Sequence, residues 1–281
     1  MSQRSRRSLL FVPGSRPERF DKAAAAGPDM VCIDLEDACL PEEKDQARDQ
    51  ALSWIAQYQG ACETVLRINS LRTPPGLRDI LALTDASPNK PLTLMLPKVD
   101  SAEDLQIVDG LLATVDCNFI ALLESASGID AAHDISRASP RLSGLMLGGA
   151  DLAAELRGEL CWEAMSYARG RLCAAAGSAE IDLIDVPWLD IRDDAGLRQE
   201  TARVKRMGFT GKAAIHPGQV AGINDTFLPS ADELARAEEI LAAFAASGKG
   251  ASQLNGRLID RPVILAAQRT VAIAQSMRNT Q

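Results

Sequence analysis

Short apolar segments recur at even intervals along most of the chain. Eight of them are rich in β-branched and long aliphatic residues, as buried strands are. They lie at Ser8–Pro13, Met30–Leu35, Val65–Asn69, Leu92–Lys98, Phe119–Glu124, Leu142–Gly148, Ile181–Val186 and Thr210–His216. Their first residues are spaced by roughly 29 positions on average, which is the length of one strand–helix unit. The pattern therefore predicts eight such units in a row.

Helix start signals stand between these strands. Ser15 and Glu18 have the spacing of a capping box before a helix at Phe20–Ala26. Ser101 and Asp104 repeat the signal after the fourth strand. Strands that alternate with helices form a parallel sheet.

Eight units of even length favour a closed barrel over an open doubly wound sheet. An open sheet that binds nucleotides often carries G-x-G-x-x-G or G-x-x-x-x-G-K-S/T, and the chain has neither. The nearest candidate, Gly148-Gly149-Ala150, follows the sixth strand and lacks the spacing. We predict a (β/α)8 TIM barrel over residues 1–228, and an open α/β sheet is the alternative.

The pattern changes after the eighth strand. Ser230 and Glu233 open one further helix, and Pro262 stands in the first turn of a last one. Asp260 precedes Pro262 by two residues, which suits an N-cap. Because a barrel closes without these residues, we predict that 229–281 form a C-terminal helical arm or lid that contacts a neighbouring subunit.

Charge and cysteine content narrow the function classes. The net charge of −8 argues against a nucleic-acid or anionic-membrane partner. Six scattered cysteines and two histidines do not form a zinc pattern. No apolar stretch approaches the ~20 residues of a membrane span. We expect a cytoplasmic protein in a reducing environment.

Polar residues gather where the predicted strands end, which is where the active site of such a barrel lies. They are Asp34, Glu36, Asp37, Arg67, Asn69, Lys98, Glu124, Asp151, Asp185 and His216. Acidic residues close four of the eight strands, with Arg67 and Lys98 among them. We therefore expect a polar active site at this end of the barrel.

Glu124 and Asp151 are the best candidates for a metal site. They stand 27 positions apart, one strand–helix unit, so they end neighbouring strands and can converge. Two carboxylates with room for water and substrate oxygens suit Mg²⁺. Alternatively, the pair faces solvent and Asp151 is the N-cap of the helix that follows it.

The remaining polar positions each allow two interpretations. Asp34–Asp37 can bind a metal, hold Arg67 or Lys98, or cap the following helix. Arg67 can fork onto a ligand carboxylate or pair with Glu36 or Asp37. We interpret Lys98 as structural.

Two weaker signals concern the first and last strands. Ser15-Arg16 offers backbone N–H groups and positive charge for a phosphate, or is an ordinary helix start. His216 is followed by Pro217, which favours a structural turn over a catalytic base.

Eight short motifs together resemble one known family. They are R-S-L-L-F-V-P-G-S-R-P-E-R-F-D-K-A (7–23), D-L-E-D-A (34–38), R-I-N (67–69), L-P-K-V (96–99), L-L-E-S-A-S-G (122–128), L-G-G-A-D-L (147–152), I-H-P-G-Q (215–219) and G-R-L-I-D-R-P (256–262). In this order they resemble the citrate lyase β-subunit-like family of the HpcH/HpaI aldolase superfamily, which includes malyl-CoA and citramalyl-CoA lyases.

The resemblance implies a Mg²⁺ cofactor on Glu124 and Asp151. It implies that Arg67 binds the carboxylate of an α-keto acid, with the backbone around Gly149 and Ala150 also in contact with it.

The same resemblance implies further roles for charged residues. Arg16 and Lys22 would lie near the phosphates of coenzyme A. Glu36 and Asp37 would be acids near the metal and the arginine. Family members are homotrimers or hexamers whose arm reaches a neighbour's site, so Asp260 would be catalytic in trans.

The resemblance implies a Mg²⁺-dependent carbon–carbon lyase that splits a 3-hydroxyacyl-CoA into acetyl-CoA and an α-keto acid. Citramalyl-CoA, which yields pyruvate, is favoured over malyl-CoA, which yields glyoxylate. The alternatives are a citrate lyase β subunit acting on a citryl-acyl-carrier-protein thioester within a complex, and a malyl-CoA thioesterase. Gly158–Trp162 and the seventh strand, with Asp182 and Asp185, depart from the family pattern and leave the substrate open.

Overall fold

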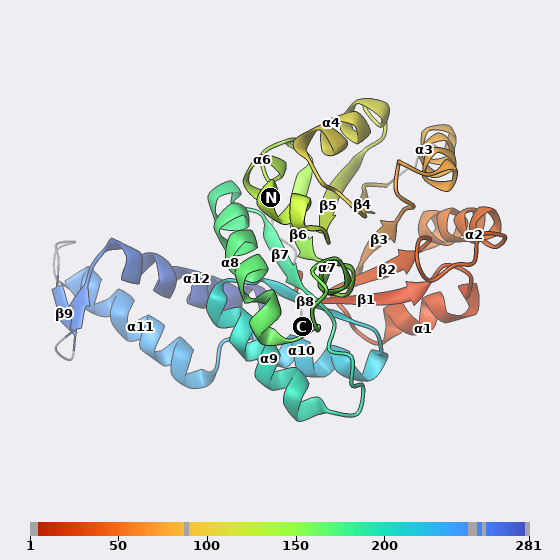
Figure 1. Cartoon of the computed structure of the whole chain (residues 1–281). Helices are drawn as coiled ribbons and strands as arrows, with labels where there is room; N and C mark the ends of the chain where they lie inside the picture. Colours follow the sequence, from red (N-terminus) through yellow and green to blue (C-terminus); the bar gives the residue numbers. More distant parts are fainter. Residues whose placement is uncertain (1–4, 87–89, 247–251, 255–256, 279–281) are drawn as a thin grey trace. The chain divides into compact units, whose positions relative to one another are not determined.

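The computed structural model describes residues 5–86, 90–246, 252–254 and 257–278 (Figure 1). The chain forms two compact units, Met1–Asn224 and Asp225–Gln281. Within the described residues, every helix is too short or too polar to cross a membrane.

Eight parallel strands close into a barrel in the first unit. Each strand pairs with the next along the chain, and β1 also pairs with β8. The strands are β1 (Ser8–Pro13), β2 (Met30–Asp34), β3 (Glu63–Arg67), β4 (Leu92–Leu96), β5 (Cys117–Leu123), β6 (Leu142–Leu147), β7 (Asp182–Asp185) and β8 (Gly211–Ala214). The predicted (β/α)8 barrel is confirmed, and the open sheet is excluded because the first and last strands are hydrogen-bonded.

Helices follow the strands on the outside of the barrel (Figure 1). They are η1 (Pro17–Arg19), α1 (Phe20–Ala25), α2 (Lys44–Gln57), α3 (Pro74–Ala86), α4 (Ala102–Leu111), α5 (Ala126–Asp130), α6 (Ala132–Ile135), α7 (Gly149–Glu155), α8 (Trp162–Ala179), α9 (Asp194–Met207), η2 (Pro217–Gln219) and α10 (Val220–Phe227). Because every strand runs in the same direction, all the loops that leave the strand ends meet at one face of the barrel.

Of the two capping boxes predicted between the barrel strands, one is present in the structure and the other is not. Ser101 and Asp104 form the predicted capping box at the start of α4. The box predicted for Ser15 and Glu18 is wrong, since no side chain caps η1 or α1. Pro17 begins a 3₁₀ turn there because its fixed φ suits a first helical position.

Apolar side chains fill the inside of the barrel. Alternate strand residues point inward, and this set comprises Leu9, Met30, Cys32, Val65, Met95, Ile120, Leu122, Met146, Ile184 and Ala213, each at most 3% exposed. The barrel is therefore a packed core that holds the strand ends in fixed positions, and it is not a channel.

The second unit is a helical hairpin. α11 (Ala231–Ala246) and α12 (Arg261–Arg278) pack against each other, and β9 (Ser252–Leu254) pairs with β10 (Arg257–Ile259). Ser230 caps α11 as predicted, and Asp260 accepts a hydrogen bond from the Val263 N–H at the start of α12. The predicted C-terminal helices are confirmed. The boundary after residue 228 and the contact with a neighbouring subunit stay predictions.

A buried network of charges joins β7 and β8 to the helices α8 and α9. The Lys212 ammonium donates to Asp185, Glu200 and the Val186 carbonyl, each at 2.7 Å. Arg169 forks onto Asp185 at 2.9 and 3.1 Å. Burial alone would raise the pKa of Asp185, but the two cations hold it below its usual value. In this network, two cations balance two carboxylates.

The two acids of the seventh strand have separate environments. Asp185 is fully buried in the network just described. Asp182 begins β7 at the opposite end of the barrel and pairs with Arg6 at 3.4 Å. Neither residue lines the cavity at the carboxyl ends of the strands.

We expect Lys212→Met to lower the free energy of unfolding by about 3–5 kcal/mol, because it leaves buried carboxylates with one cation too few. Urea unfolding followed by circular dichroism measures the loss. Lys22→Met, at an exposed position, is the control and should change stability by less than about 0.5 kcal/mol. Equal stability of the two variants would contradict the assignment.

Candidate active site at the carboxyl ends of the strands

A cavity of about 330 Å³ opens at the carboxyl ends of the barrel strands. Its walls are largely apolar, and its charged lining residues are Asp34, Asp37, Arg67, Glu124 and Asp151. Gly149 and Ala150 line it as well. The structure thus brings together most of the residues that the sequence singled out.

Arg67, the last residue of β3, lies at the centre of the acidic cluster. Its Nε and Nη2 donate to the two carboxylate oxygens of Asp34 at 2.7 and 2.6 Å. Its Nη1 lies 3.3 Å from Glu36, and Nη2 lies 3.8 Å from Asp37. The guanidinium also covers the ring of Phe11 at 5.2 Å. The predicted pairs with Glu36 and Asp37 are present, but Asp34 is the main partner.

The sequence indicates that the segment Asp34–Asp37 can hold Arg67, but it does not indicate that Asp34 is the main partner. Asp34 ends β2 directly beside Arg67, because the two residues are paired in the sheet register. A strand-by-strand alignment of the last residues of the second and third strands could have found it. Its role follows from pairing between strands, which spacing along one strand does not show.

Glu124 follows β5 and is 6% exposed. Its Oε1 accepts a hydrogen bond from the backbone N–H of Lys98 at 2.8 Å. Burial, together with the charges of Glu36 and Asp151, raises the pKa of Glu124 to about 8. Burial also raises the pKa of Glu36, although Arg67 opposes the shift. Glu124 and Glu36 therefore both resist ionisation when no metal ion is bound.

Gly148 and Gly149 let the loop after β6 approach the other walls. A Cβ on Gly148 would lie 2.3 Å from the Cβ of Glu124, and one on Gly149 would lie 2.7 Å from Leu160 and Val186. The N-cap of α7 is Gly148, so Asp151 is the third residue of the helix. The alternative interpretation of Asp151 as the N-cap is therefore wrong, and its exposed carboxylate lines the cavity.

The composition of the site fits a divalent cation. Five carboxylates (Asp34, Glu36, Asp37, Glu124 and Asp151) surround two cations (Arg67 and Lys98), which leaves an excess of three negative charges. One buried oxygen, Oε2 of Glu36, accepts no hydrogen bond, and its charge is met by Nη1 of Arg67 at 3.3 Å. Among the described residues, no three acidic, cysteine or histidine side chains form a protein-only cage. The donors suit Mg²⁺, which commonly keeps water and substrate oxygens.

Other predicted residues lie outside the cavity lining. Arg16 and Lys22 are exposed, beside η1 and in α1. Asp260 is exposed in the second unit. The Nδ1 of His216 accepts a hydrogen bond from Gly218, as the interpretation of a structural turn requires.

The raised pKa of Glu124 generates a pH prediction. In the folded, metal-free protein, the Glu124 carboxyl keeps its proton up to about pH 8. In the unfolded chain, a Glu carboxyl releases its proton at about pH 4.3. The folded state therefore binds more protons between these values, and its stability falls as pH rises through them. In the presence of a chelator, we expect Glu124→Gln to be more stable than the wild type at pH 8 and to lose this advantage towards pH 5.

Urea unfolding at pH 5, 6.5 and 8 measures this difference. Glu103→Gln is the control, because Glu103 is exposed in the first turn of α4 and should show a difference independent of pH. A Glu124→Gln difference that is the same at all three pH values would show that the carboxyl titrates normally.

Family and sequence comparisons agree with this geometry. Residues 7–217 match the HpcH/HpaI aldolase/citrate lyase family, and residues 161–276 match a family of carbon–carbon bond lyases of the TIM-barrel fold. The L-malyl-CoA/β-methylmalyl-CoA lyase of Cereibacter sphaeroides is 36% identical over 97% of this chain and 95% of its own. The citrate lyase β subunit of Leuconostoc mesenteroides subsp. cremoris is 32% identical over 98% of this chain and 95% of its own.

A thioesterase and a solved structure extend the comparison. The (3S)-malyl-CoA thioesterase of Cereibacter sphaeroides is 33% identical over 96% of this chain and 95% of its own. CitE of Mycobacterium tuberculosis, solved with magnesium, acetoacetate and coenzyme A, has a TM-score of 0.82 at 32% identity and covers 96% of this chain and 98% of its own. These matches span nearly the whole chain, and the chain is a carbon–carbon lyase that belongs to the HpcH/HpaI aldolase/citrate lyase family.

Proposed function

We propose that this enzyme is a Mg²⁺-dependent lyase that cleaves a 3-hydroxyacyl-CoA into acetyl-CoA and an α-keto acid. The observation that carries the proposal is the excess of carboxylates around Arg67 in a cavity with apolar walls. Such a site attracts a divalent cation and still offers one guanidinium to an anionic substrate. Relatives named for CoA thioesters, and one solved with magnesium and coenzyme A, support the same chemistry.

Glu124 and Asp151 would hold the ion. When bound, Mg²⁺ would polarise the hydroxyl and the adjacent carboxylate of the substrate. Lys98 keeps Oε1 of Glu124 engaged through its N–H, so Oε2 is the oxygen available for the ion. Glu36 and Asp37 would complete the acidic surroundings of Arg67, either directly or through water.

Arg67 would bind the carboxylate of the keto-acid half of the substrate. The fork onto Asp34 fixes the guanidinium through Nε and Nη2, and a ligand carboxylate would approach it on the Nη1 side, where Glu36 lies 3.3 Å away. The backbone of Gly149 and Ala150 would contact the same carboxylate from the other side of the cavity. A carboxylate that is held on two sides orients the bond that is to break.

The reaction balances with one proton that leaves and one that returns. The substrate's hydroxyl proton would pass to water, the carbon–carbon bond would break, and the electron pair of that bond would pass into the enolate of acetyl-CoA. Asp260 of a neighbouring subunit would protonate the enolate carbon, or remove that proton in the condensation direction. Arg16 and Lys22, both exposed, would bind the phosphates of coenzyme A.

Pyruvate is the favoured keto acid, which makes citramalyl-CoA the favoured substrate. Among the described residues that line the cavity, Arg67 is the sole basic one. The second carboxylate of oxaloacetate would therefore face acids, whereas the methyl group of pyruvate suits walls such as Phe11 and Met146. Glyoxylate, and hence malyl-CoA, is the next candidate, in keeping with the name of the malyl-CoA lyase relative.

Two other activities use the same residues. A citrate lyase β subunit acts within a complex on a carrier-protein thioester, and a malyl-CoA thioesterase hydrolyses its product. The relatives at 32% and 33% identity carry these names.

Incubation of the protein with Mg²⁺, acetyl-CoA and each of pyruvate, glyoxylate and oxaloacetate tests the proposal. We expect an adduct with pyruvate, detected by mass and abolished by a chelator. Free thiol that appears with the adduct would instead establish the thioesterase. Failure with all three keto acids, followed by activity on a citryl carrier-protein thioester, would establish the citrate lyase subunit.

Complementation between inactive variants tests the proposed role of Asp260. We expect Asp260→Asn and Glu124→Gln each to lack turnover, because one lacks the proton donor and the other a metal ligand. In mixed oligomers, a site can combine Glu124 from one subunit with Asp260 from another. Random mixing should therefore restore up to about a quarter of wild-type turnover.

Calorimetry on the separate variants completes this test. Asp260→Asn should still bind pyruvate in the presence of Mg²⁺, whereas Glu124→Gln should not. Mixed oligomers without activity would place both residues in the same subunit's site, and normal turnover by Asp260→Asn would exclude the residue from catalysis.

A further inference from the structure

The turn that follows β4 contains a strained residue beside the proposed metal ligand. Lys98 has φ +55°, in the left-handed region that residues with a side chain rarely adopt. A residue held in this region persists where the surrounding structure over-determines it, and such residues gather at functional sites. Lys98 comes directly before the segment that contacts Ser125, the neighbour of Glu124.

The backbone of Lys98 is aimed at one oxygen of Glu124. Its N–H donates to Oε1 at 2.8 Å, across the gap between the ends of β4 and β5. On the other side of Glu124, a Cβ on Gly148 would come within 2.8 Å of Oε2. One carboxylate oxygen is therefore engaged by the turn, and the carboxylate is oriented with the other oxygen towards the loop after β6.

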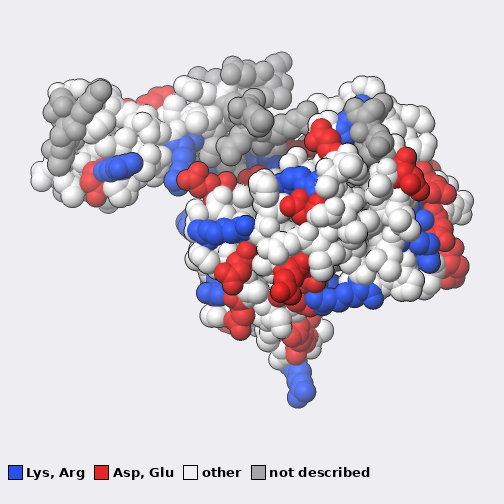
Figure 2. All heavy atoms as spheres, turned by 90° about the horizontal axis from the view of Figure 1, so that it is seen from above, with Lys and Arg blue, Asp and Glu red and all other residues white. Residues whose placement is uncertain are grey.

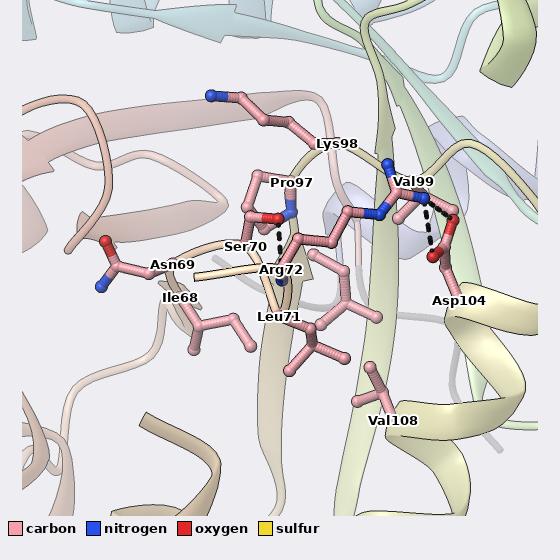
Figure 3. Close-up of a pocket in the computed structure, with 11 residues that line it drawn as sticks. Ile68, Asn69, Ser70, Leu71, Arg72, Pro97, Lys98, Val99, Asp104 and Val108 are labelled. Atoms are coloured by element: carbon pink, nitrogen blue, oxygen red, sulfur yellow. Dashed lines mark hydrogen bonds and ion pairs between the residues drawn. The ribbon is translucent and has the colours of Figure 1, made fainter. Parts of the chain in front are cut away.

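The turn is fixed by contacts on both of its sides. Arg72 forms ion pairs with Asp100 and Asp104, and the hydroxyl of Ser125 donates to Asp100. Figure 3 shows Arg72 directed at Asp104 on one side, while the side chain of Lys98 extends in the opposite direction. These contacts hold the backbone after Lys98 and so maintain its unusual conformation.

A second close approach shows how tightly this turn is packed. A Cβ on Gly128, in α5, would lie 2.5 Å from the carbonyl oxygen of Val99. The Val99 N–H also donates to the Leu122 carbonyl at 3.4 Å. The turn is therefore pressed against the end of β5, where Glu124 lies.

The side chain explains why this position holds lysine, although glycine adopts the same backbone without strain. The Lys98 ammonium lies 3.1 Å from Oε1 of Glu36. One residue thus contacts two acids of the site, Glu124 through its backbone and Glu36 through its ammonium.

We propose that Lys98 is a positioning residue. Its left-handed conformation lets the chain pass from the end of β4, where its N–H faces Glu124, into the fixed turn at Asp100, and this N–H orients the carboxylate for the metal ion. The inference rests on the proposed function, since it takes Glu124 as a ligand of Mg²⁺. It adds that the backbone conformation at Lys98, and not the charge of the Lys98 side chain, sets the affinity of the site for Mg²⁺.

Two substitutions that remove the same charge separate these causes. Asn tolerates the left-handed region, whereas the β-branched side chain of Val opposes it. We expect Lys98→Asn to bind Mg²⁺ at least as tightly as the wild type, and Lys98→Val to bind it about tenfold or more weakly, as loss of an orienting contact to a metal ligand does. Isothermal titration of the metal-free proteins with MgCl₂ measures both.

Glu180 provides a matched control. It has φ +57° at the C-cap of α8 and is exposed. Glu180→Val should lower the melting temperature relative to Glu180→Asn, as Lys98→Val should relative to Lys98→Asn, but it should leave the affinity for Mg²⁺ unchanged. Lys98→Ala gives the same comparison in weaker form if Lys98→Val does not fold.

Equal affinity of Lys98→Val and Lys98→Asn for Mg²⁺ would overturn the inference. An equal loss of Mg²⁺ affinity in Glu180→Val would also overturn it, because backbone strain far from the site would then be enough to weaken Mg²⁺ binding. Absence of Mg²⁺ binding by the wild-type protein would instead remove the proposed metal site itself, and this result is distinguishable from the other two.

Discussion

The fork between Asp34 and Arg67 joins the ends of two neighbouring strands at the mouth of the barrel. Because the residues are paired in the sheet register, the contact forms when β2 and β3 align, and it fixes the guanidinium on two of its nitrogens. Glu36 and Asp37 then follow from the chain that continues past Asp34, and both approach the same guanidinium. Glu36 and Asp37 are therefore placed relative to this pair.

The two charge clusters of the barrel differ in their balance of positive and negative charge. In the buried network, Arg169 and Lys212 compensate Asp185 and Glu200. At the mouth, acids outnumber bases, and burial raises the pKa of Glu124 to about 8. A network with balanced charges stabilises the fold once it is formed. A network with excess negative charge lowers the stability of the ligand-free protein, and a bound cation restores it by supplying the missing charge.

Charge on the face that Figure 2 shows follows neither pattern. On the face that Figure 2 shows, the described basic and acidic side chains are interspersed. The concentration of acidic residues at the strand ends is therefore a property of the site, and it does not simply reflect the acidic composition of the chain. This contrast strengthens the case that the carboxylates at the mouth act together.

The sequence by itself determined the eight strands, the barrel, the C-terminal helices and the placement of Glu124, Asp151 and Arg67 at the face of the barrel where the strands end. It could do so because strand length, apolar runs and even spacing are local properties, and a closed parallel barrel brings all strand ends to one face. Only the tertiary structure decided that Asp34 is the partner of Arg67, that Asp151 lies inside α7 and that Lys98 adopts a left-handed conformation. These features depend on strand register and on contacts between separate loops, and neither is encoded in the spacing of residues along one segment.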